Sequence, residues 1–302
     1  MKNKSKVTFI YAYDGEEWST PMALVKEFQL RGWETEIVSI GSNRTGNYND
    51  LKLQRWIELK PQTDIIIFMD WGRFDSPYLH KSLVPNAFWV QESGDDPQNF
   101  ERNFPKSNRF HLTFTPDFEA YTEYKNRGIN ARWITHFADT EVQYPMNLEP
   151  KYVAVTSRGL GNSGFLDHLT NWAEGAIGNR NGMDAKEHTQ FLNSGLMVIQ
   201  NSRWGEITRR IFEGMACGKL VLTDRLNENK KLHEIFIDKE DIIYYDDMFD
   251  CIEKINYYNE NENERERIAY NGFQKVTHNY TQIQVVDKLI EEWKNYQSVS
   301  AS

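Results

Sequence analysis

"LMVIQNSRWGEITRRIFEGMACGKLVLTD", residues 196–224, decides the fold of this chain. The runs 196–200 and 219–224 are short and almost continuously apolar, as expected of strands buried on both faces of a parallel sheet. Between them, apolar residues recur at helical spacing over 206–216, and Gly218 follows as a stop signal. A strand, a helix and a second strand in this order predict a βαβ unit.

The same alternation occurs in both halves of the chain. Strands are predicted at 7–13, 35–40, 64–71, 86–92, 110–115 and 131–137, and again at 152–157, 196–200, 219–224 and 241–247. The stretch 138–151 interrupts the rhythm with two prolines and no apolar period, which indicates a linker. We therefore expect an α/β protein with two Rossmann-like, doubly wound parallel-sheet domains that face each other across a cleft.

The expected domain limits follow from this pattern. Residues 1–137 are expected to form an N-terminal Rossmann-like domain, 138–151 the linker, 152–280 a C-terminal Rossmann-like domain, and 281–302 a C-terminal helix. Ligands of such sheets bind at the carboxyl ends of the strands.

Composition and net charge limit the classes of protein to which the chain can belong. The 302 residues are 39% hydrophobic and 14% aromatic, enough for two cores, and the net charge is −9, which disfavours nucleic acid or anionic lipid as a partner. Only two cysteines are present, so a disulfide framework is excluded and a reducing compartment is expected. No signal peptide and no apolar run of transmembrane length is recognisable, and we expect a cytoplasmic protein.

Four charged residues, Glu206, Arg209, Arg210 and Glu213, fall within two turns of the helix that follows strand 196–200. One interpretation is two surface ion pairs at spacing i,i+4, each worth only ~0.2–0.5 kcal/mol. The other depends on position. A helix N-terminus at the carboxyl end of a strand favours phosphate, arginines add bidentate contacts, and a carboxylate can accept both hydroxyls of a ribose. The second interpretation predicts a nucleotide-sugar site.

The segment "RRIFEGMACGKLVLTDR", followed by "LHEIFIDKEDIIYYDD" and "RERIAYNGFQKVTHNYT", resembles the C-terminal half of the spore-maturation-protein-like, family-1-type glycosyltransferases, which have the GT-B architecture. "HLTFTPDFEAYTEYKNRGINARWITHFADTEVQYP" and "FWVQESGDDPQNFE" are similar to N-terminal parts of that family. The resemblance covers about two-thirds of the chain and leaves 14–60 and 157–190 poorly matched. It implies an enzyme, expected to be a hexosyltransferase, that transfers a sugar from a nucleotide-sugar to an acceptor hydroxyl. It further implies that the domain 1–137 binds the acceptor, that the domain 152–280 binds the nucleotide-sugar, and that the helix 281–302 returns to the N-terminal domain.

The resemblance also implies roles for individual residues of the second domain. Glu213 would bind the ribose, and Arg210 and Arg209 the diphosphate. Arg158 would be a further phosphate contact or a solvated loop arginine, and Asn201 and Arg203 would line the same site. The family's donor-sugar acid falls at position 205, which is Gly here, so that role passes to the adjacent Glu206 with less support.

Catalytic groups are expected from the first domain. Asp95 and Asp96, in "QESGDDPQ" after strand 86–92, are candidates for taking the acceptor proton, although Gly-Asp-Asp-Pro is equally good turn chemistry. A retaining transfer would need no strong protein base, because the leaving phosphate can serve. Gly15, after the first strand, is either a phosphate-loop glycine or a plain turn residue.

Neither a cofactor nor a metal is expected, since the acidic pairs and the histidines do not have the sequence spacing of metal ligands. His136 is expected to pack at the hinge or to face the cleft. A UDP-sugar is the expected donor, and the acceptor is a glycan, a protein or a small molecule. Two alternatives stay open: a phage-type transferase acting on modified DNA bases, which the net charge disfavours, and a non-catalytic nucleotide-sugar-binding protein. An oxidoreductase is disfavoured because no Gly-x-Gly-x-x-Gly follows the first strand.

Overall fold

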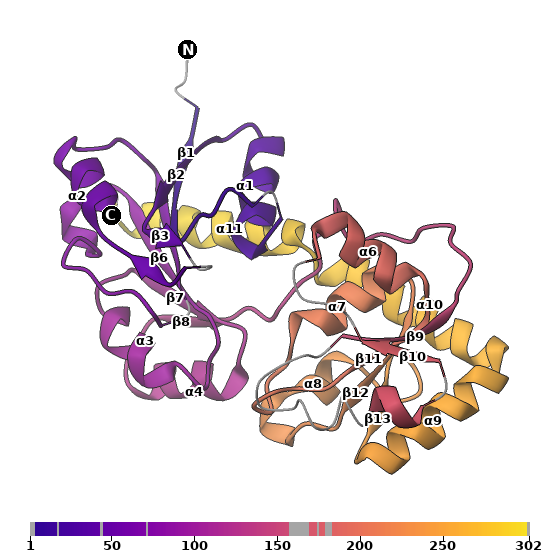
Figure 1. The fold of residues 1–302 in the computed structure, drawn as a ribbon. Coiled ribbons are helices and arrows are strands. Elements are labelled where there is room, and N and C mark those ends of the chain that lie inside the picture. Colours follow the sequence, from indigo (N-terminus) through magenta and orange to yellow (C-terminus); the bar gives the residue numbers. More distant parts are fainter. Residues whose placement is uncertain are drawn as a thin grey trace. The chain divides into compact units, whose positions relative to one another are not determined.

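The computed structural model describes residues 4–16, 18–42, 45–70, 72–156, 169–173, 175–178 and 183–300. The chain divides into two compact units (Figure 1). Unit 1 comprises Met1–Thr135 with Gln282–Ser302, and unit 2 comprises His136–Thr281. Within the described residues, no helix combines the length and the apolar character needed to cross a membrane.

Unit 1 is built on a six-stranded parallel sheet in the order β2-β1-β5-β6-β7-β8. The strands are β1 (Lys6–Tyr11), β2 (Glu34–Ser39), β5 (Ile65–Asp70), β6 (Phe88–Ser93), β7 (Leu112–Thr115) and β8 (Ala131–Trp133). All residues of β5 and β6 are buried, which explains why their apolar stretches, 65–69 and 88–90, are continuous rather than alternating. A two-stranded hairpin, β3 (Gly41–Ser42) and β4 (Asn47–Tyr48), lies outside this sheet.

The helices of unit 1 are α1 (Thr20–Leu30), α2 (Leu51–Glu58), α3 (Phe100–Ser107), α4 (Phe118–Asn126) and α11 (Gln282–Ser300), with a 3-10 turn η1 (Lys81–Leu83). The C-terminal helix α11 belongs to this unit although it follows unit 2 in the chain (Figure 1). Arg31, after α1, pairs with Asp287 of α11 at 2.5 Å, and Trp33 packs edge-on against Trp293 with ring centroids 5.1 Å apart.

Unit 2 contains a five-stranded parallel sheet in the order β10-β9-β11-β12-β13. Its strands are β9 (Tyr152–Val155), β10 (Ala176–Gly178), β11 (Gly195–Gln200), β12 (Leu220–Asp224) and β13 (Ile243–Tyr245). Its helices are α6 (Ala185–Asn193), α7 (Arg209–Ala216), α8 (Leu232–Ile235), α9 (Met248–Glu260) and α10 (Glu262–Asn279), with a 3-10 turn η2 (Glu228–Lys230).

Helix α7 packs directly on the sheet of unit 2. A Cβ atom added at Gly214 would come within 2.9 Å of Val221 Cγ2 and 3.3 Å of Val198 Cβ, so glycine permits this close approach. The segment 139–151 contains neither helix nor strand and is held to unit 2, where Asn193 of α6 donates to the carbonyl of Tyr144 and accepts from the backbone N–H of Met146.

The predicted doubly wound parallel sheets are confirmed, and the helices α9 and α10 that follow the last strand meet at Asn261. The elements that were not predicted include α2, α3, the hairpin strands β3 and β4, and the edge strand β10. The predicted start of the key helix at Glu206 is wrong, because α7 begins at Arg209 with Thr208 as its N-cap residue.

Candidate functional site

The first turn of α7 carries both arginines. Arg209 and Arg210 are its first two residues. Cations are unfavourable at a helix N-terminus by about 0.3–1 kcal/mol each, because the unpaired N–H groups already carry partial positive charge. Two cations placed there form a strongly electropositive position, which an anion would stabilise.

Glu213 lies one turn further along α7 and is only 5% exposed. Its Oε1 pairs with Arg209 Nε at 2.9 Å, so one of the two expected i,i+4 pairs is present. The other is absent from the described residues, because Glu206 lies before the helix. Burial alone would raise the pKa of Glu213, but Arg209, His188 and Arg210 outweigh it and hold the pKa below its usual value. Glu213 is therefore a buried carboxylate that stays ionised at neutral pH.

Two histidines complete this charged cluster. His136 precedes the segment leading to β9, and His188 lies on α6. Burial, and then the charge of Arg209, lowers the pKa of His136 to about 4. Burial likewise lowers the pKa of His188. Both rings are neutral at pH 7, so they can offer a hydrogen bond without adding charge. The sequence had given no role to His188, since a lone histidine on a helix carries no spacing signal.

Three polar groups near the start of α7 have no hydrogen-bond partner among the described residues. They are the side-chain amide of Gln200, whose oxygen and nitrogen are both unpartnered, the hydroxyl of Thr208, and Nε of Arg203. Gln200 ends β11 and is fully buried, while Thr208 is 6% exposed. Leaving such a group unsatisfied costs about 1–3 kcal/mol, so their concentration at one strand end indicates a place that a ligand or water completes.

The conformation of the loop between β11 and α7 is stabilised by the carboxylate of Glu206. Glu206 accepts hydrogen bonds from the backbone N–H of Trp204 at 2.6 Å and of Arg203 at 3.4 Å. The Arg203 guanidinium stacks on the Trp204 ring at 4.3 Å. The carboxylate of Glu206 thus organises this loop from within, a contact that the sequence had not indicated.

Asn201 and Ser202 tie the same loop to the neighbouring strands. Tyr245, at the end of β13, donates to Asn201 Oδ1 at 2.9 Å and to the carbonyl of Gln200 at 2.8 Å. Asp224, at the end of β12, accepts hydrogen bonds from both the backbone N–H and the hydroxyl of Ser202. The structure therefore brings Asn201, Arg203, Glu206 and the α7 residues together at the carboxyl end of the unit 2 sheet.

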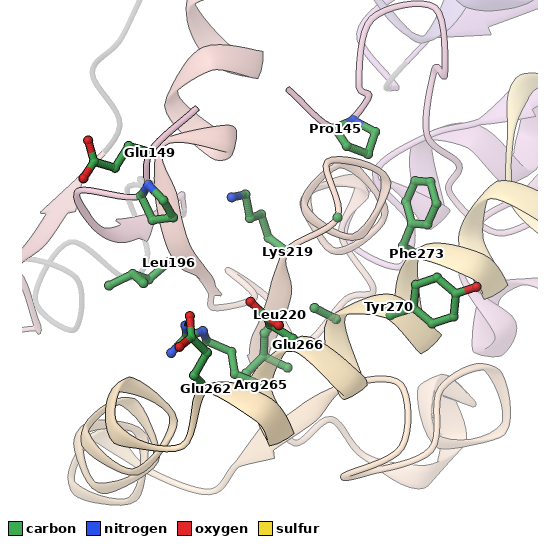
Figure 2. Close-up of a pocket in the computed structure, with 13 residues that line it drawn as sticks. Pro145, Glu149, Leu196, Lys219, Leu220, Glu262, Arg265, Glu266, Tyr270 and Phe273 are labelled. Carbon is green, nitrogen blue, oxygen red and sulfur yellow. The ribbon is translucent and has the colours of Figure 1, made fainter. Parts of the chain in front are cut away.

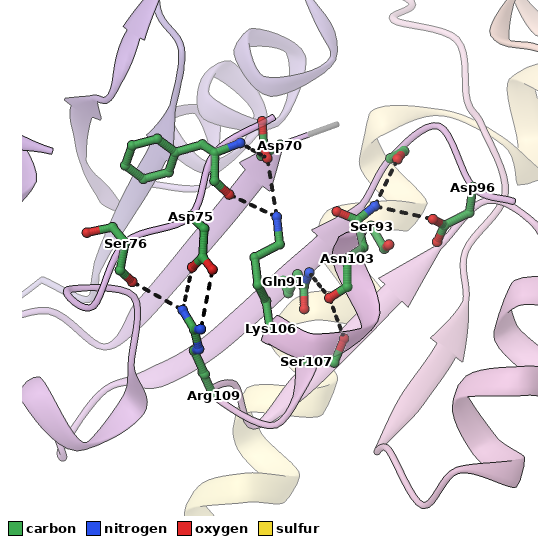
Figure 3. A network of polar contacts seen from close by, with 12 residues as sticks. Asp70, Asp75, Ser76, Gln91, Ser93, Asp96, Asn103, Lys106, Ser107 and Arg109 are labelled. Atoms are coloured by element: carbon green, nitrogen blue, oxygen red, sulfur yellow. Dashed lines mark hydrogen bonds and ion pairs between the residues drawn. The ribbon is translucent and has the colours of Figure 1, made fainter. Parts of the chain in front are cut away.

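In unit 1, Asp95 and Asp96 lie in the turn between β6 and α3. Asp96 is 2% exposed, and its carboxyl accepts a hydrogen bond from Asn103 Nδ2 at 3.2 Å (Figure 3). It accepts a second hydrogen bond from Thr115 Oγ1 at 3.0 Å. Burial raises the pKa of Asp96 to about 7. Asp95 is more exposed and has a left-handed backbone, with φ 54°. The two adjacent carboxyls therefore have different surroundings, and Asp96 contacts the interior of its own unit.

Gly15 and Arg158 were also predicted to belong to the site. Gly15 follows β1 in unit 1 with φ +78°, and open space surrounds the position that a Cβ would occupy. Arg158 lies outside the described residues. Within the described part of the chain, no group of three or more histidine, cysteine, aspartate or glutamate side chains is arranged to hold a metal ion.

One family model and several solved structures are similar to this chain. Residues 151–291 match the family model described as glycosyl transferase-like. No curated protein matches the sequence. Among solved structures, sucrose-phosphate synthase from Thermosynechococcus elongatus is similar with a TM-score of 0.70 and 11% identity, over 99% of this chain and 100% of that one.

Two further structures have the same fold. HepE from Anabaena, in complex with UDP-glucose, matches with a TM-score of 0.68 and 12% identity, over 96% of this chain and 99% of that one. A glycosyltransferase from Rickettsia africae matches with a TM-score of 0.68 and 13% identity, over 97% and 98% of the two chains. The fold predicted from the sequence is thus confirmed: the chain has the GT-B architecture, and residues 151–291, which include most of unit 2, match a glycosyl transferase-like family model.

Proposed function

We propose that the protein transfers a sugar from a nucleotide-sugar, with a UDP-sugar as the donor, to an acceptor hydroxyl. The observation that carries the proposal is the pairing, on one short helix, of two arginines in the first turn with a buried, ionised glutamate one turn later. The helix N-terminus and the arginines match a diphosphate, and the carboxylate of Glu213 matches the two hydroxyls of a ribose.

The unpartnered groups beside the arginines support the same assignment. A nucleoside diphosphate carries both donors and acceptors, which the buried amide of Gln200 and the hydroxyl of Thr208 require. Similar GT-B structures were determined with UDP and with UDP-glucose, which supports uridine as the base and a hexose as the transferred sugar. The proposal includes a retaining transfer that needs no metal. The catalytic roles of Asp95 and Asp96 stay predictions.

Donor turnover tests the proposal. The protein is incubated with UDP-glucose, UDP-galactose and UDP-N-acetylglucosamine, with and without EDTA, and the release of UDP is followed. We expect slow hydrolysis of one donor, unaffected by EDTA and strongly reduced in Arg210→Ala. If no donor is hydrolysed or transferred by folded protein, the enzymatic proposal is wrong.

A second candidate, a protein that binds a nucleotide-sugar without reaction, is favoured by one observation. The family's donor-sugar acid is replaced by Gly205, and the neighbouring Glu206 uses its carboxylate on the backbone of Trp204. Selective UDP binding together with an absence of any donor hydrolysis would support this candidate instead.

A further inference from the structure

A second recess lies in unit 2, at the opposite end of its sheet from α7's first turn. Leu196 and Leu220, which line it, stand at the amino ends of β11 and β12. Its volume is about 790 Å³, within the range of about 300–1,000 Å³ typical of small-molecule sites. We call it the α10 groove, because that helix supplies much of its wall (Figure 2).

One part of the α10 groove is aromatic. Tyr270, 62% exposed, and Phe273 project from α10, and Pro145 from the segment before β9 lies near them (Figure 2). Tyr270 lies on the exposed face of α10 and presents a flat apolar ring to the groove, whose wall also contains the apolar residues Leu196, Leu220 and Ala269. Such a ring can stack on any ligand that has a flat apolar face.

The other part is charged. Glu149, Glu262 and Glu266 contribute carboxylates, and Arg265 is committed to the carbonyl of Tyr258 at 2.6 Å and to Glu262 at 3.3 Å. Lys219 is half-buried and forms no ion pair with any described residue. Burial lowers its pKa, and Figure 2 shows its ammonium group extending into the space between Glu149 and the aromatic side.

These features exclude two kinds of ligand. With Glu262 paired to Arg265, an anion would meet the carboxylates of Glu149 and Glu266 against the single ammonium of Lys219. A purely apolar ligand would bury those charges without partners, at a cost of several kcal/mol. A neutral polyhydroxylated ligand avoids both problems, because its hydroxyls donate to carboxylates and accept from an ammonium, while the C–H face of its ring stacks on Tyr270.

We propose that the α10 groove is a binding site for a neutral oligosaccharide, separate from the proposed donor site. Aromatic stacking on Tyr270 and Phe273 holds the sugar ring, and Lys219 with the neighbouring glutamates orients its hydroxyls. The inference goes beyond the proposed function and does not depend on it, because the two sites lie at opposite ends of the same sheet.

The test is calorimetric titration of the full chain with neutral hexasaccharides built from glucose, mannose, galactose or N-acetylglucosamine, and with a hexauronate as the anionic comparison. We expect one or more neutral oligosaccharides to bind with a Kd below about 1 mM, and the hexauronate not to bind. Tyr270→Ala should weaken binding ~5–10-fold and Lys219→Met ~10-fold or more, since each removes a direct contact.

Matched controls keep the result interpretable. Phe249→Ala removes an exposed aromatic ring from the start of α9, outside the groove, and should leave oligosaccharide binding unchanged. Tyr270→Ala should leave UDP binding unchanged, which separates this site from the donor site. The proposal is overturned if no neutral oligosaccharide binds, if the hexauronate binds instead, or if binding is the same in wild type, Tyr270→Ala and Lys219→Met.

Discussion

Removing the carboxylate of Glu213 should weaken nucleotide binding in protein that still folds. The side chain is 5% exposed and ionised, so a ribose bound to it would receive charge-assisted hydrogen bonds in a site shielded from water. Losing both bonds in Glu213→Ala costs about 2–4 kcal/mol, or ~30–1,000-fold in affinity for UDP. Glu213→Gln keeps one acceptor but loses the charge, and should cost about 1–2 kcal/mol, or ~5–30-fold.

The ion pair with Arg209 makes the choice of variant important. Glu213→Ala leaves a largely buried guanidinium without its partner at 2.9 Å, which should lower stability by about 3–5 kcal/mol. Glu213→Gln retains an oxygen for Arg209 and serves as the milder perturbation. The UDP affinity of each variant, measured by calorimetry, should therefore be compared with its thermal stability. The exposed Glu253→Ala on α9 serves as the control. Wild-type affinity in both folded Glu213 variants would refute the ribose assignment.

Three further predictions concern stability. Burial raises the pKa of Asp96 in the folded state to about 7, so ionisation of this carboxyl destabilises the fold progressively as the pH rises from about 4 to 7. Asp96→Asn should abolish this loss, and urea unfolding at pH 8 should show that the variant is more stable than wild type. Gly214→Ala should destabilise unit 2 by about 1–3 kcal/mol, because its methyl meets Val221 at 2.9 Å, and an unchanged urea midpoint would contradict the packing. Lys106→Met should cost about 3–5 kcal/mol in thermal unfolding, because it leaves buried Asp70 without the ammonium 3.4 Å away (Figure 3), whereas a small loss would show that the pair contributes little.

The alternation of strands and helices could be predicted because both sheets are parallel and their central strands are buried, so that these strands contain continuous apolar runs such as 65–69. Helix α3 was not predicted, since "FERNFPKS" is short and contains Pro105 within the helix. The start of α7 was placed three residues too early. Glu206 has good helical spacing to Arg210, but its carboxylate bonds to the backbone before the helix begins.

The candidate site was partly visible in the sequence. Glu213 and the two arginines stand at helical spacing after a strand, which local pattern alone reveals. The unpartnered state of Gln200 and Thr208 depends on what packs around them, so no sequence pattern reports it. His188 joins the cluster only because α6 lies near α7 in the fold, and its neutral charge follows from burial rather than from sequence.

The most direct test of the nucleotide-sugar site is calorimetric titration of the wild-type protein with UDP, GDP, ADP and TDP under identical salt conditions. The account predicts saturable binding of UDP at one site, with weaker or no binding of the other three. If none of the four binds to folded protein, the arginines and glutamate of α7 are only packed and paired with each other, and the nucleotide-sugar assignment is wrong.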